Sequence, residues 1–147
     1  MAVTVSLYNH TTRKFANGEN APNDVYKVML LNSAATFVAS HTVLSLTTAS
    51  GGAEVSGNGW TAGGEIVGNT AVSTITTNDA MFDGDDISVT ATTGAIGPAW
   101  NAILYNSSAD NYPPVLFISF GESKQADVGT PFKINWNANG IITFTYT

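Results

Sequence analysis

The 147-residue sequence predicts an all-β fold: a single-domain antiparallel β-sandwich or barrel-like structure of about eight strands with a C-terminal hairpin. Short segments rich in β-branched and aromatic residues recur along the chain, bounded by Gly, Pro, Asn and Asp, as is typical of strands and turns. No stretch repeats apolar residues at helical spacing over three turns. No repeat unit or linker divides residues 1–147, so we expect one core.

Eight segments carry the strand pattern, and three of them have apolar residues on both faces. These three, Val25–Leu31, Ala99–Tyr105 and Val115–Phe120, are the predicted central strands, because a strand covered on both sides is apolar throughout. Ile87–Thr92 alternates apolar and hydroxyl residues, which predicts one wet face. The eight predicted strands are Val3–Leu7, Val25–Leu31, Thr70–Thr77, Ile87–Thr92, Ala99–Tyr105, Val115–Phe120, Phe132–Trp136 and Ile141–Tyr146.

The last two strands are predicted to form the hairpin, because Asn137-Ala-Asn-Gly140 between them suits a four-residue turn. Trp100 and Trp136 are expected in the core because they lie inside strands. The Gly-rich stretch Ser50–Gly64 is expected to be an excursion or edge segment anchored by Trp60. Helix is limited to a turn or two, near Thr12–Ala16 or Ala34–His41.

Charged residues make up only 11% of the chain, whereas soluble domains average about 25%. Nineteen Thr and fourteen Asn supply polarity through short uncharged side chains, which lose little entropy when a contact forms. Such a surface suits burial between subunits, although a monomer with a Thr-rich exposed sheet remains the alternative. The net charge of −6 disfavours nucleic acid as a partner, since the only adjacent basic pair is Arg13-Lys14.

The sequence contains no cysteine, so disulfides, thiolate nucleophiles and cysteine-ligated zinc are excluded. It also predicts neither a membrane-spanning helix nor a secretory leader, because no apolar run is long enough and the first residues lack the basic-then-apolar pattern. Membrane is therefore not an expected partner.

The candidate motifs for chemistry are weak. Gly57–Ala62 has the letters of a dinucleotide fingerprint but no strand before it or helix after it. Asp83, Asp85 and Asp86 could hold an ion, yet they lack calcium-loop spacing and Asp-Gly pairs commonly form turns. The sequence leaves this point open.

The remaining polar candidates also favour structural roles. His10 and His41 lie far apart in the sequence, and Glu54 with Glu65 would act as a glycosidase pair only if they faced each other. Tyr112 precedes two prolines in a loop and is the best candidate for an exposed contact residue. We therefore predict no catalytic, cofactor-binding or metal residues, and no enzyme activity.

Several blocks resemble small β-rich structural proteins of tailed bacteriophages, and the resemblance extends over almost the whole chain. Proteins of this kind are described variously as head, tail or fibre proteins. The blocks are Tyr26–Leu31, Val55–Trp60, Asn78–Asp83, Ile96–Ala99, Ile103–Tyr105, Phe117–Gly121 and Phe132–Gly140.

The resemblance implies a virion protein that binds other virion proteins and has no family catalytic residue. We expect a capsid cement or decoration protein, made in the host cytoplasm, that binds the outside of the head and stabilises contacts between major capsid proteins. It would act as a homo-oligomer, with a trimer suggested by capsid geometry alone. The alternatives are a small tail or fibre component, or a carbohydrate-binding module for attachment to the host surface.

Overall fold

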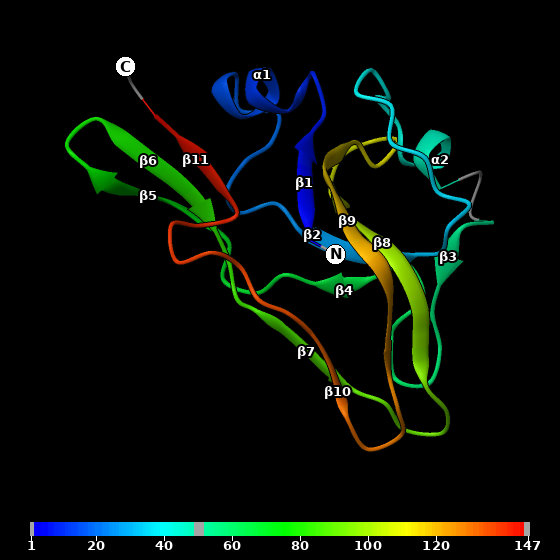
Figure 1. Ribbon diagram of the computed structural model, residues 1–147. Helices are drawn as coiled ribbons and strands as arrows, with labels where there is room; N and C mark the ends of the chain where they lie inside the picture. The colour runs from blue at the N-terminus through cyan, green and yellow to red at the C-terminus, as the bar shows by residue number, and fades with distance from the viewer. Residues whose placement is uncertain (1, 49–51, 146–147) are drawn as a thin grey trace.

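The computed structural model describes residues 2–48 and 52–145 and confirms the all-β class, with 44% strand and 7% helix. Every strand pair in this part of the chain is antiparallel. A six-stranded sheet faces a ribbon made of two smaller sheets, which gives the molecule a sandwich-like arrangement (Figure 1). No helix among the described residues is long and apolar enough to cross a membrane.

The six-stranded sheet contains all three predicted central strands. Its order is β1 (Thr4–Leu7), β9 (Pro114–Ala126), β8 (Ile96–Asn106), β2 (Tyr26–Leu31) and β3 (Glu54–Val55), with β4 (Glu65–Ile66) also paired with β2. The strands β2, β8 and β9 lie inside this order, so each is flanked by hydrogen-bonded neighbours. The apolar residues on both faces of these strands are buried, because other segments of the protein cover both sides of the sheet.

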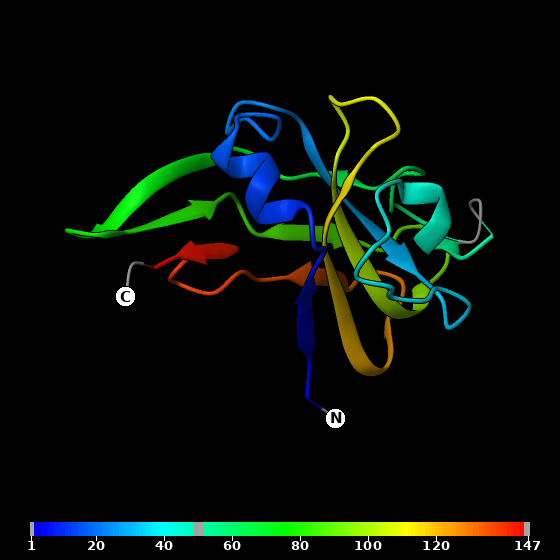
Figure 2. The same cartoon turned by 90° about the horizontal axis from the view of Figure 1, so that it is seen from above.

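The second layer is a ribbon built from five shorter strands. The strand β6 pairs with β5 and with β11, whereas β7 pairs with β10. The hairpin of β5 and β6 extends away from the six-stranded sheet (Figure 2). The bounds of these strands are β5 (Ala71–Thr76), β6 (Asp79–Asp83), β7 (Ile87–Thr90), β10 (Pro131–Ile134) and β11 (Ile142–Phe144).

The predicted C-terminal hairpin is wrong, because β10 and β11 do not pair with each other. Ile134 lies opposite Ile87, and Ile142 lies opposite Phe82, so both strands run along the same stretch of chain. A tight turn does form, since Gly140 has a φ of 91° and its N–H donates to Asn137 O at 2.8 Å. The turn belongs to a loop of residues 135–141 that interrupts one continuing strand. Tyr146 lies outside the described residues.

The six-stranded sheet has a core on each face. On one face, Tyr26, Leu104 and Ile118 pack with Phe82 and Phe132 of the ribbon. The core on the other face lies between the sheet and the segment that carries the helix α2 (Leu44–Thr47). Its buried members are Tyr8, Met29, Leu31, Ala35, Leu44, Ala53, Ile103, Tyr105 and Phe117.

The two short helices agree only partly with the sequence. The helix α1 (Thr11–Ala16) matches the expected turn near Thr12–Ala16. The second helical segment is α2, whereas Ala34–His41 has no helix. The chain around α2 is held by side chains, since the Tyr8 hydroxyl lies 3.0 Å from Thr47 Oγ1. Burial raises the pKa of Tyr8 to about 12, so this phenol stays protonated.

The three tryptophans lie in different surroundings. Trp60 is 2% exposed and anchors the Gly-rich segment, as predicted, whereas Ser50 and Gly51 of that segment lie outside the described residues. Trp100 is 42% exposed, so its predicted place in the core is wrong. Trp100 does lie inside the strand β8, but the register of β8 with β9 shifts between Ala99 and Asn101, so a place within the strand does not put this side chain in the core. Trp136 is half-buried at the edge of the core.

We expect Trp60→Ala to lower the free energy of unfolding by about 3–5 kcal/mol, because it removes a buried aromatic that contacts Phe132. The matched control is Trp100→Ala, which should cost about 1 kcal/mol because that residue is 42% exposed and belongs to neither core cluster. Urea unfolding followed by circular dichroism measures both. Equal losses in the two variants would contradict the burial described here.

Candidate functional site: an apolar groove beside the sheet edge

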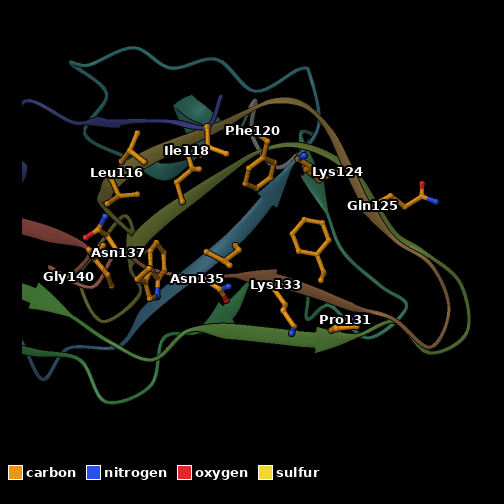
Figure 3. Close-up of a pocket in the computed structure, with 16 residues that line it drawn as sticks. Leu116, Ile118, Phe120, Lys124, Gln125, Pro131, Lys133, Asn135, Asn137 and Gly140 are labelled. Atoms are coloured by element: carbon orange, nitrogen blue, oxygen red, sulfur yellow. The ribbon is translucent and has the colours of Figure 1, made fainter. Parts of the chain in front are cut away.

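An open groove of about 570 Å³ separates strands β1 and β9 from residues 131–141. Figure 3 shows Leu116, Ile118 and Phe120 pointing from β9 toward this segment. The residues that line it are Val3, Val5, Leu116, Ile118, Phe120, Lys124, Gln125, Pro131, Phe132, Lys133, Ile134, Asn135, Trp136, Asn137, Gly140 and Ile141.

The groove exists because the six-stranded sheet is wider than the ribbon that covers it. Val5 lies opposite Ile118 in the pairing of β1 with β9, so the two side chains share a face. Ile118 is buried beneath the ribbon, whereas Val3 is 56% exposed and Val5 is 58% exposed. The outermost strand therefore presents apolar side chains that nothing in the described chain covers.

The opposite wall is the loop of residues 135–141, which Asp85 and Asp86 hold in place. The Trp136 backbone N–H donates to Asp86 Oδ1 at 2.7 Å, and its indole N–H donates to the Asp85 carbonyl oxygen at 3.0 Å. At Gly140 a Cβ would come within 2.9 Å of both Met81 Cβ and Phe82 O. The close approach and the positive φ both require glycine there.

The Asp83-Gly-Asp-Asp86 cluster is accordingly part of this support. Besides the Asp86 bond, Asp85 Oδ2 accepts a hydrogen bond from Asn69 Nδ2 at 2.7 Å. Asp83 Oδ1 is buried and has no hydrogen-bond partner among the described residues. No three carboxylate or imidazole side chains come together as a metal site in residues 2–48 and 52–145.

The polar rim of the groove carries little net charge. Lys124 donates a hydrogen bond to Glu122, and this bond lowers the pKa of the Glu122 carboxyl. Lys133 is exposed on β10, and Gln125, Asn135 and Asn137 provide uncharged amides. None of the described lining residues is an acid, a histidine or a hydroxyl residue. An apolar surface with a few polar groups at its rim has the composition that is typical of protein interfaces.

The two histidines and two glutamates singled out in the sequence serve separate structural contacts. His10 Nε2 lies 2.8 Å from the Pro114 carbonyl oxygen, and His41 Nδ1 lies 3.0 Å from Thr47 Oγ1. Burial lowers the pKa of His10. Glu54 accepts a hydrogen bond from the Gly63 N–H, and Glu65 accepts one from the Thr61 N–H. Each carboxylate therefore stabilises a nearby turn of the Gly-rich segment.

The Gly57–Ala62 motif is a tight turn and not a nucleotide-binding loop. Gly57 and Trp60 exchange backbone hydrogen bonds of 2.8 and 3.0 Å across Asn58 and Gly59, whose φ values are both positive. No helix follows this turn.

Tyr112 is 53% exposed, as predicted, and borders a second hollow of about 600 Å³. Its φ of 48° and that of Asn111, 63°, place two consecutive residues in the left-handed region. Ser45, Ser107 and Asp110 provide polar groups in the same hollow.

The groove could not be located from the sequence, although several residues that form it were identified as strand or loop residues. Comparisons with protein-family models, with curated proteins and with solved structures found no match for this chain. Its function must therefore be argued from its own geometry.

We expect Asp86→Ala to lower the free energy of unfolding by about 1 kcal/mol, because the Trp136 N–H loses its acceptor. Asp86→Asn should retain most of that stability, since the amide oxygen can accept the same bond. A suitable control is Asp110→Ala, which removes an exposed carboxylate from another loop. Urea unfolding measures all three, and equal stability of Asp86→Ala and the parent would contradict the supporting role.

Proposed function

We propose that this chain is a bacteriophage virion structural protein, a capsid cement or decoration protein that binds the outside of the head and stabilises contacts between major capsid proteins. The observation that carries the proposal is the open apolar groove at the uncovered edge of the sheet. Exposed apolar surface of this kind on a small protein marks a site of contact with another protein. The resemblance of the sequence blocks to tailed-phage structural proteins supports the choice of partner.

The electrostatics support attachment outside the head, away from packaged DNA. The net charge is −6, and the one adjacent basic pair is already occupied. Arg13 and Lys14 both contact the Glu19 carboxylate, at 3.1 and 2.5 Å. The hydrogen bond from Lys14, together with one from Asn17 and the positive charges of Lys14 and Arg13, lowers the pKa of Glu19 to about 2. Little positive charge is left to neutralise phosphate.

The weakly charged groove also suits a surface that offers the same contact many times. A capsid repeats identical sites, so a modest apolar contact gains strength when several subunits are engaged together. Because few charges line the groove, the contact should depend little on ionic strength.

A carbohydrate-binding module is the second candidate, and the Tyr112 hollow is the observation that favours it. An exposed ring held by a backbone in the left-handed region, beside serine hydroxyls and an aspartate, could stack on a sugar. A small tail or fibre component is the third candidate, and it would use the same groove on a different partner.

Purified protein should bind, at a fixed stoichiometry, to capsids of the matching phage that lack it. Co-sedimentation should give similar binding at about 0.1 M and 1 M salt, because apolar contacts are not screened. The bound capsids should survive heating to a higher temperature. Trp136→Ala should weaken binding about tenfold or more, whereas Tyr112→Ala should leave it unchanged.

Circular dichroism melting of each variant shows whether it is folded before binding is compared. Binding only to tails would favour the tail or fibre alternative. Binding only to host polysaccharide, lost in Tyr112→Ala and kept in Trp136→Ala, would favour the carbohydrate-binding module. Binding to capsids that disappears at high salt would contradict the role given to the apolar groove.

A further inference from the structure

The strand β1 is an open edge of the six-stranded sheet. It pairs with β9 on one side, and no strand of the described residues pairs with its other side. Figure 2 shows β1 projecting from the body of the molecule toward the N-terminal end. An open edge presents unpaired backbone N–H and C=O groups, which are a template for another strand.

Residues 2–9 lack the charges, prolines and bulges that often protect such an edge. Proteins block pairing at open edges with charged side chains, prolines or bulges. The segment Ala-Val-Thr-Val-Ser-Leu-Tyr-Asn has no charge, proline or glycine, and β1 pairs with β9 without a register shift. Its apolar residues Val3, Val5 and Leu7 are 56%, 58% and 42% exposed. The open edge of β1 is therefore suited to pairing with another strand.

The sequence of β1 is complementary to itself when it is read around Val5. In an antiparallel pair centred on Val5, Val3 of one copy lies opposite Leu7 of the other, and Thr4 lies opposite Ser6. The two Val5 residues face each other. Every cross-strand pair then joins apolar to apolar or hydroxyl to hydroxyl, which are the favourable combinations.

We propose that β1 pairs with β1 of a second copy of this chain, antiparallel and around a two-fold axis that passes between the two Val5 residues. The pairing joins two paths of five strands, from β3 to β1 in each copy, into one continuous sheet. Ten strands are within the usual upper size of an open twisted sheet. A two-fold interface also closes on itself, so association stops at the dimer.

The pairing also brings the two grooves together. A two-fold axis between antiparallel strands is perpendicular to the sheet, so side chains on one face stay on one face. Val3 and Val5 line the groove of each copy, and both grooves therefore open on the same side of the joined sheet. The dimer presents one longer apolar surface to a partner.

Three of the other edge strands are less suited to this pairing. The strand β5 is exposed, but its register with β6 shifts between Thr74 and Thr76. The edge strands β3 and β11 have two and three residues. The two-fold pair replaces the trimer suggested by capsid geometry, and it does not depend on the virion assignment, because it can be measured on the purified protein alone.

Sedimentation equilibrium of the purified protein should show a dimer. Val5→Lys should weaken dimerisation by about 100-fold, because it places two ammonium groups opposite each other at the axis. Val128→Lys is the matched control: Val128 is also 58% exposed, lies in the loop after β9, and should dimerise like the parent. A parent protein that stays monomeric at high concentration would overturn the proposal and leave β1 free for a segment of another protein.

The register is tested by cysteine cross-linking, for which the cysteine-free chain provides a clean background. Directly paired residues in antiparallel strands have Cα atoms about 4.5–5.5 Å apart, within the range that a disulfide spans. Val5→Cys should therefore form a covalent dimer under mild oxidation. Val3→Cys should not, because the two copies of that residue lie about 13 Å apart in this register. Cross-linking of Val3→Cys as fast as Val5→Cys, or dimerisation that resists Val5→Lys, would overturn the pairing.

Discussion

The pairing of β8 with β9 is the interaction on which the rest of the structure depends. These are the two longest strands, and they carry β2 on one side and β1 on the other. Their paired segments bury apolar side chains on both faces, so each face holds its own core. Register shifts on both sides of Ala99 bend the pair, and the pairing continues as far as Ile96 and Ala126.

The sequence predicted this centre well because the relevant signal is local. Strands that are apolar on both faces, such as Val115–Phe120, can only be stable when both faces are covered. The errors arose where pairing is not local. The Asn137–Gly140 turn is a real turn, yet its flanking strands pair with β7 and β6, which lie about forty to sixty residues earlier in the chain. The strand β6 was missed because its aspartates at both ends indicate turns.

The candidate site could be predicted only in part, for a related reason. Val3, Val5 and Ile118 lie in segments that were correctly identified as strands. These residues form one groove because β1 adds to the sheet beyond the edge of the ribbon that covers it. The hydrophobic periodicity of the sequence does not show how far the ribbon extends over the sheet. Trp136 shows the same limit, because its half-buried place depends on hydrogen bonds to Asp85 and Asp86 from a distant turn. The absence of charge in residues 2–9 is a signal of the open edge that the sequence does contain.

The loop of residues 135–141 is the part of the proposed contact surface that can vary most easily. The strands on either side of it are each fixed by their own pairing, β10 with β7 and β11 with β6. Changes at exposed loop positions such as Asn135 therefore leave both registers intact, whereas Gly140 and Ile141 tie the loop to the core. Because this loop forms one wall of the groove, substitutions at its exposed positions can change the shape of the proposed contact surface while the folded scaffold stays the same.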